Sequence, residues 1–135
     1  MKKLVSVFFV AAFTTLGFTS CNEDDDYETI QSVEKVKIDS VSIVNDTMDV
    51  FAIQSIRTYQ KFNNQCEGFY GYDYAHTSDF GRNITAYKFK TNANCGTGNF
   101  TGVNQINFAP KVVGTYQFKF WTGDNTFITK TIVVQ

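Results

Sequence analysis

The residues best suited to catalysis lie in one polar segment, where His76, the only histidine of the chain, is followed by Ser78 and Asp79. A hydrolase triad uses these three residue types, because a base activates the hydroxyl and a carboxylate orients the base. Neighbouring residues of a loop rarely point at one another as those roles require. No Gly-rich phosphate loop, HExxH or GxSxG motif accompanies them. We therefore predict no catalytic residue and interpret His76 as an exposed loop residue.

The cysteines do not have the pattern of a metal site. Cys66 and Cys95 are far apart in sequence, and with a single distant histidine they do not supply the four ligands of a zinc cage. No motif with a histidine partner accompanies either cysteine as a nucleophile. Paired carboxylates for glycoside hydrolysis are not excluded by the sequence, but a folded part of this length is small for a deep cleft. We predict no metal and no cofactor.

The N-terminus has the anatomy of an export signal. Lys2 and Lys3 precede an apolar stretch at residues 4–12, which is too short for a membrane span. The stretch Phe18-Thr19-Ser20-Cys21 resembles a bacterial lipobox, with Phe18 in place of the usual aliphatic residue. The resemblance implies that residues 1–20 are removed, that the Cys21 thiol carries the lipid, and that the protein is attached to the outer membrane through it.

An acidic run, residues 22–28, follows Cys21 and holds five of the 13 acidic residues. Like charges keep such a segment extended and solvated. It resembles the sorting signal of surface-exposed lipoproteins of Bacteroidetes-type bacteria, which implies exposure on the cell surface. A plain spacer and attachment facing the periplasm are the alternatives. Residues 29–135 have a small positive excess, which is too weak to indicate a nucleic-acid partner.

If Cys21 carries the lipid, Cys66 and Cys95 remain as an even pair in an exported chain. Both lie at the turn-rich ends of predicted strands. We predict a disulfide bond between them, with Cα atoms about 5.5 Å apart.

The rest of the chain predicts strands, because apolar residues alternate with period two and no long stretch keeps a helical period. In residues 115–121, for example, Tyr116, Phe118 and Phe120 share one face. Turn residues separate the runs, and a hairpin is predicted after Trp121. The fold class is all-β, a single antiparallel sandwich of about seven strands over 33–135, after a tether at 21–32. The predicted strands are 33–43, 48–62 (bent or split near 52–55), 66–74, 82–91, 103–109, 115–121 and 127–134.

The end of the chain carries a more specific pattern. Gly114-Thr115-Tyr116-Gln117-Phe118 is followed by a turn and a strand rich in Thr and Val. This resembles the last two strands of bacterial immunoglobulin-like modules. The resemblance implies an immunoglobulin-like sandwich and places Tyr116 at the position of a tyrosine corner. The cysteine pair and core tryptophan of antibody domains are absent.

Trp121 is the candidate binding residue, together with Asp124 and Asn125 in the following turn. If Tyr116 and its alternates face inward, Trp121 faces outward, where an indole can stack on a sugar or anchor a protein. The alternative is that Trp121 folds over the end of the sandwich as a plug. Tyr70, Tyr72 and Tyr74 share a face in an ideal strand, and they either line the core or extend the Trp121 surface.

Two short motifs resemble O-glycosylation sites of exported proteins in the same bacterial group, Asp39-Ser40-Val41 and Asp46-Thr47-Met48. The resemblance makes Ser40 and Thr47 the candidate acceptors. A three-residue pattern occurs often by chance, so both residues are equally consistent with plain strand positions.

Together these features predict a lipid-anchored cell-surface binding or accessory module without catalytic activity. Its partner would be a protein or a glycan, in addition to the membrane lipid held through Cys21. The alternative is a small periplasmic inhibitor or chaperone-like lipoprotein that acts on an enzyme.

Overall fold

The computed structural model describes residues 28–135 and consists of nine β-strands with no helix in that range. The predicted signal peptide and Cys21 lie outside the described residues. The strands are β1 (Ile30–Val36), β2 (Ser40–Ile43), β3 (Thr47–Met48), β4 (Gln54–Asn64), β5 (Glu67–His76), β6 (Gly81–Thr91), β7 (Thr97–Phe108), β8 (Gly114–Gly123) and β9 (Thr126–Val134).

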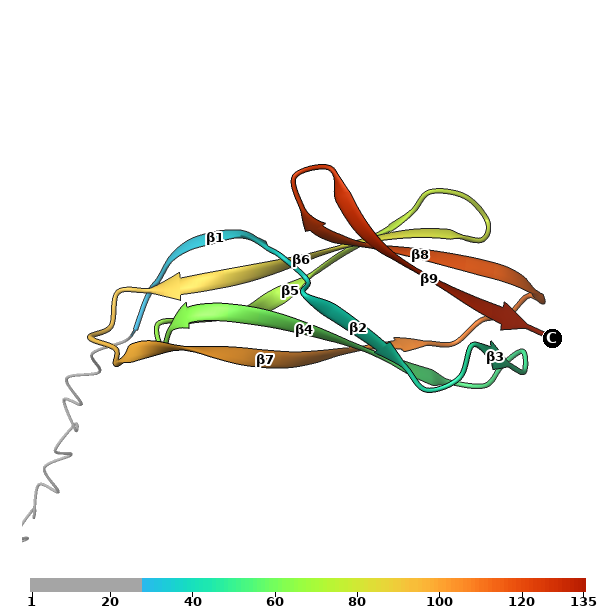
Figure 1. Ribbon diagram of the computed structural model, residues 1–135, viewed down its shortest axis with the longest axis horizontal. Helices are drawn as coiled ribbons and strands as arrows, with labels where there is room; N and C mark the ends of the chain where they lie inside the picture. Colours follow the sequence, from blue (N-terminus) through green and yellow to red (C-terminus); the bar gives the residue numbers. More distant parts are fainter. Residues whose placement is uncertain (1–27) are drawn as a thin grey trace, which may run out of the picture.

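The strands form two layers (Figure 1). One sheet has six strands. In it β6 pairs with β5, with β1 and with β8, and the sheet continues from β8 through β9 to β3. The other sheet has three strands in the order β2-β4-β7. The molecule is therefore a β-sandwich, in which β5 and β7 are edge strands of the two sheets and contact one another.

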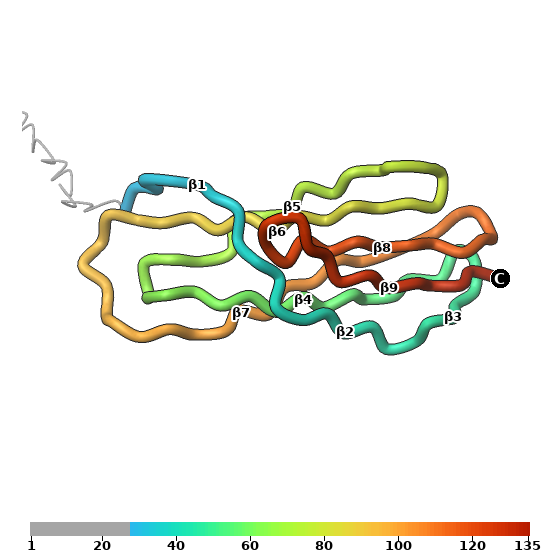
Figure 2. The backbone as a smooth tube through the Cα atoms, turned by 45° about the horizontal axis from the view of Figure 1, so that its top comes forward, coloured from blue at the N-terminus to red at the C-terminus, as the bar shows by residue number. Residues whose placement is uncertain are grey.

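Strand β6 shares one of its edges between two partners (Figure 2). Its C-terminal half pairs with β1 in antiparallel fashion, and residues 81–84 pair with β8 in parallel. A second parallel pair joins β3 to β9. The prediction of a purely antiparallel sandwich was wrong at these two places. The chain leaves β6, crosses to the other sheet as β7 and returns as β8 in the same direction as β6, which a hairpin could not achieve.

The strand number also exceeds the seven predicted, because two runs are divided. The run 33–43 breaks where the chain changes sheet, and there the Ile38 amide donates to the Trp121 carbonyl while the Asp39 amide donates to the Tyr59 carbonyl. The run 48–62 breaks at 49–53, close to the predicted position. At this break Phe51 adopts a positive φ of 66°.

The core lies between the sheets and follows the predicted alternation. Tyr116, Phe118 and Phe120 are buried, while the intervening Gln117 and Lys119 are exposed. The other sheet contributes Ile56, Phe62 and Phe108, among others. Burial of these apolar faces is the main favourable contribution to folding. Glycine is required at position 114, where φ is +157° and an added Cβ would collide with the ring of Phe80.

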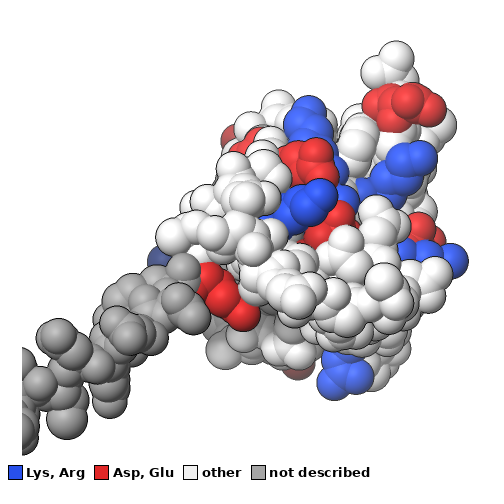
Figure 3. All heavy atoms as spheres, turned by 90° about the vertical axis from the view of Figure 1, so that its left-hand side faces the viewer, with Lys and Arg blue, Asp and Glu red and all other residues white. Residues whose placement is uncertain are grey.

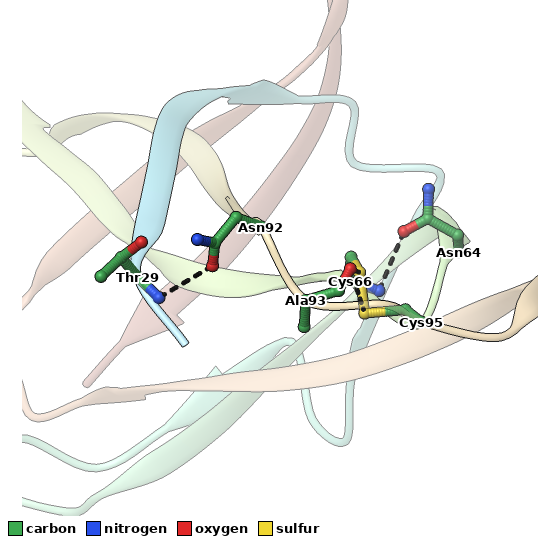
Figure 4. The surroundings of a disulfide bond; sticks show 6 residues. All are labelled: Thr29, Asn64, Cys66, Asn92, Ala93 and Cys95. Carbon is green, nitrogen blue, oxygen red and sulfur yellow. Dashed lines mark hydrogen bonds between the residues drawn. A yellow bond between two sulfur atoms is a disulfide. The ribbon is translucent and has the colours of Figure 1, made fainter. Parts of the chain in front are cut away.

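The predicted disulfide between Cys66 and Cys95 is confirmed, with a Cα separation of 5.4 Å (Figure 4). It ties the β4–β5 turn to the link between β6 and β7. The backbone amide of Cys66 donates to the Asn64 side chain, and the Thr29 amide donates to Asn92. The disulfide therefore lies at the end of the sandwich where β1 begins.

Charged side chains of both signs are mixed at this end of the molecule (Figure 3). Lys88 forms ion pairs with Glu67 at 2.9 Å and with Glu34 at 3.2 Å, which link β5, β6 and β1. Burial raises the pKa of Glu67, but the Asn63 amide and Lys88 outweigh it, so the pKa lies below the ordinary value. The buried carboxylate is thus ionised and paired.

Two predictions about tyrosines have different outcomes. The Tyr116 hydroxyl donates to the Val112 carbonyl at 2.9 Å, which is the bond expected of a tyrosine corner. Tyr70, in contrast, does not share a face with Tyr72 and Tyr74. A bulge between Phe69 and Gly71 shifts the register, so Tyr70 is 58% exposed while the other two are partly buried and pack against the core.

Candidate functional site

A cavity of about 1080 Å³ opens between the two sheets on the side of the free edges β5 and β7. Its walls are the end of β5, the β5–β6 hairpin, the end of β7 and the following loop. In Figure 1 these links lie at one end of the long axis, and the start of β1 lies at the other end. The cavity and the disulfide therefore occupy opposite ends of the sandwich.

Aromatic rings form much of the cavity wall. Tyr74 comes from β5, while Tyr116 contacts both Phe80 and Phe108. The Tyr116 ring meets Phe80 and Phe108 edge to face, with centroids 5.0 and 4.9 Å apart. Such edge-to-face packing fixes the rings and leaves an apolar lining. Gln105 and Asn107 add amide groups from β7. A mixed lining of this kind is typical of small-molecule sites.

The position of Tyr72 in the wall is fixed by a polar network that crosses between the sheets. Its hydroxyl is hydrogen-bonded to Thr58, which also accepts from the Gln60 amide. Asn104 donates to Gln60 Oε1 at 2.8 Å. Thr58 and Gln60 are fully buried, so each polar group requires its partner. Burial raises the pKa of Tyr72 despite the opposing Thr58 and Gln60 bonds, so the phenol stays neutral.

Arg82 lies in the cavity wall with only 8% of its surface exposed. It faces inward because β6 alternates, and Ile84 and Ala86 are buried on the same face. Its Nη1 donates to the carbonyls of residues 78, 79 and 81 at 3.1, 3.2 and 2.8 Å. The guanidinium also lies 5.4 Å from the centre of the Tyr116 ring. Burial raises the pKa of the adjacent Tyr74, although the Arg82 charge opposes that rise.

His76, Ser78 and Asp79 all border the cavity. His76 is exposed, as predicted, but it belongs to the end of β5 rather than to a loop. Its ring contacts Tyr74, with centroids 5.6 Å apart. Within residues 28–135, no hydrogen bond joins the side chains of His76, Ser78 and Asp79. They are near one another but lack the contacts of a triad.

The predicted surface around Trp121 is separate from the cavity. Trp121 is half-buried, and its indole N–H donates to the Asp124 carbonyl at 2.9 Å within its own turn. Lys35 lies over the ring, 5.6 Å from its centre. Asp124 and Asn125 are exposed, and none of the three residues lines the cavity. The indole donor is thus already used, and binding at this surface stays a prediction.

The remaining predicted sites give simple results. Ser40 and Thr47 are both exposed at the starts of β2 and β3, so their hydroxyls are accessible, and their glycosylation stays a prediction.

The part of the chain from residue 28 onward holds no cluster of three or more His, Cys, Asp or Glu side chains suited to a metal. None of its segments is a helix long and apolar enough to cross a membrane. Cys21 lies outside the described residues.

Sequence reasoning missed Arg82 as a site residue, although a signal for it was present. The alternation that places Ile84 and Ala86 inward also places Arg82 inward. A charged residue on the buried face of a strand requires a partner, and this marks a candidate site. The contributions of β7 and of the loop after it could not be found in the same way, because they depend on how the two sheets pack.

No model of a known protein family, no curated protein and no solved structure matches this chain. Its function therefore has to be inferred from its own residues and their geometry.

Proposed function

We propose that this protein is a lipid-anchored, cell-surface binding module without catalytic activity, and that its ligand occupies the cavity between β5, β6 and β7. The observation that carries the proposal is the cavity itself, whose aromatic and amide lining suits a small molecule. The lack of hydrogen bonds among the side chains of His76, Ser78 and Asp79 favours binding over hydrolysis.

The position of the cavity supports the anchoring part of the proposal. The described chain begins at the end of the sandwich opposite the cavity (Figure 1). A lipid on Cys21, followed by an acidic tether, would hold the disulfide-bonded end toward the membrane. The cavity would then face outward, where a ligand can reach it.

We also propose that the sandwich is of the immunoglobulin-like class. The bond from Tyr116 to Val112 and the β8–β9 hairpin support this, since both are features of the last two strands of such modules. The parallel pairing of β6 with β8 is an additional feature that an immunoglobulin-like assignment has to accommodate.

Ligand binding is tested by calorimetry with a panel of neutral and acidic sugars and small aromatic acids. We expect at least one of them to bind, and Ala109→Trp, which adds bulk to the cavity wall, to abolish binding. Thr101→Trp is the matched control, because Thr101 is exposed on β7 and does not line the cavity. Binding that survives Ala109→Trp, or no binding of any probe, would contradict the proposal.

The anchor is tested by protease treatment of intact cells. Surface exposure predicts loss of the protein, and Cys21→Ser predicts an unprocessed or soluble product. The alternative of a periplasmic inhibitor or escort predicts full protection from protease. Exposed apolar side chains at the β3 end, including Val44, Phe51 and Ile53, are a surface that such a role could use.

A further inference from the structure

Arg82 differs from the other buried charged residue of the described chain in having no acidic partner. Glu67 is 7% exposed and forms an ion pair with Lys88 at 2.9 Å. Arg82 is 8% exposed, and no ion pair joins it to any residue in the range 28–135. Its Nε is buried and has no hydrogen-bond partner. The fold thus neutralises one buried charge within the chain and leaves the other uncompensated.

The contacts that Arg82 does make offset only part of the cost of burial. Three carbonyls accept from Nη1, and the Tyr116 ring faces the guanidinium. Carbonyl dipoles and an aromatic face stabilise a cation but do not cancel its charge. A buried unit charge is costly without a counterion. The wall of the cavity therefore carries an unneutralised positive charge beside aromatic rings.

Asp79 is the acidic residue that borders the cavity, and it does not fill this role. Its backbone carbonyl accepts from Arg82 Nη1, at 3.2 Å, but its exposed carboxylate forms no ion pair with the guanidinium. Asp73, which is also near in sequence, is exposed and alternates with the inward-facing Tyr72 and Tyr74. Neither carboxylate neutralises Arg82.

We propose that the cavity binds a small organic carboxylate, whose anionic group pairs with Arg82 while its ring or chain body lies against the aromatic wall. This proposal rests on the proposed function and specifies its ligand class. One cation matches one negative charge, so a monoanionic carboxylate fits better than a phosphate dianion, which would bring an excess buried charge. Tyr74, Phe80 and Tyr116 provide the apolar surface for the body of the ligand. A sugar acid and an aromatic acid share this chemistry.

The test compares each acid with its neutral amide, using calorimetry on the full-length protein. The probes are D-glucuronate with D-glucuronamide, and 4-hydroxybenzoate with 4-hydroxybenzamide. We expect the acid of at least one pair to bind about 10- to 100-fold more tightly than its amide, the range of a hydrogen-bonded charge pair. The pair that shows this preference identifies the source of the carboxylate. Amides that bind as tightly as the acids would overturn the proposal.

Three variants assign the preference to Arg82. Arg82→Gln should bring the acid and the amide of a pair to similar affinities. Arg57→Gln is the matched control, because Arg57 is the only other arginine and is exposed on β4. Asp79→Asn should keep or increase the preference, since it removes a negative charge from the cavity border. An acid preference that persists in Arg82→Gln, or that Arg57→Gln abolishes, would overturn the proposal.

Controls separate misfolding and failure of the proposed function from failure of this inference. The fluorescence of Trp121 verifies the fold of each variant, and if Arg82→Gln does not fold, Arg82→Lys provides the same comparison with the charge kept. Lysine keeps the positive charge but lacks the planar fork of arginine, so Arg82→Lys should retain only part of the acid preference. If acids and amides bind equally and Ala109→Trp abolishes both, the binding function stands and the carboxylate proposal fails. If no probe binds the unmodified protein, both fail.

Discussion

Removal of the disulfide between Cys66 and Cys95 is expected to cost this protein a large part of its stability. The perturbation is the double substitution Cys66→Ala and Cys95→Ala, made in a Cys21→Ser background so that no free thiol or lipid interferes. Hydrogen bonds from the Gln65 amide to Gly96 and from the Thr91 amide to Cys66 hold the same segments together in the folded protein. The folded state should therefore keep its geometry, and the effect should lie in the unfolded chain.

The magnitude follows from the length of the loop that the bond closes. The two cysteines are separated by 29 positions. In the chain-entropy treatment, a disulfide that closes a loop of this length stabilises the folded state by about 3.6 kcal/mol at 25 °C, because it restricts the unfolded chain. Total stabilities of single domains are about 5–15 kcal/mol, so the loss would be a large fraction of the whole. The Cα separation of 5.4 Å lies within the range of unstrained disulfides.

The assay is equilibrium unfolding in urea followed by the fluorescence of Trp121, the only tryptophan. With a slope of about 1.5 kcal/mol per molar urea, the midpoint should fall by about 2.4 M. The Cys21→Ser protein measured with a reductant should give the same midpoint as the double variant. A loss below about 1 kcal/mol would refute the reasoning, because it would mean that the bond does not restrict the unfolded chain as the loop length requires.

Three further predictions have defined outcomes. Glu67→Gln should lower the free energy of unfolding by about 1–3 kcal/mol at pH 7, because Lys88 loses a buried charged partner. The folded pKa of Glu67 lies below its ordinary value of 4.5. The stability difference between the two proteins should therefore be complete above pH 4.5 and shrink as the pH falls through the folded pKa. Urea unfolding from pH 7 to pH 3 measures this difference. Tyr116→Phe should cost about 1 kcal/mol through loss of its hydroxyl bond, whereas Tyr70→Phe at an exposed position should change the urea midpoint little. Gly114→Ala should destabilise by more than about 1 kcal/mol, seen as a lower thermal midpoint, and an unchanged midpoint would contradict the strain described there.

The sequence determined the class of fold because strand alternation is a local property. A side chain two positions from Phe118 faces the same way, so the inward set in β8 could be identified without any knowledge of neighbours. The disulfide was also predictable, since the predicted export signal and the assignment of Cys21 to the lipid leave Cys66 and Cys95 as one another's partners. The hairpin between β8 and β9 followed from its turn residues.

Other features required the tertiary structure, for separate physical reasons. The parallel pairing of β6 with β8 arises from a crossover through the other sheet, and no local pattern encodes which edge a returning strand joins. The bulge that exposes Tyr70 breaks the alternation that sequence reasoning assumes.

The cavity combines both kinds of information. Arg82 faces inward because of its place in β6, and the sequence contains that signal. Whether a buried arginine meets an acid from another strand or remains uncompensated depends on which side chains the opposite sheet and the adjoining loops bring to it. Here they bring aromatic rings, amides and backbone carbonyls but no paired carboxylate from residues 28–135. That outcome was decided by the packing of the two sheets, because the residues concerned lie far apart in the sequence and meet only when the sandwich forms.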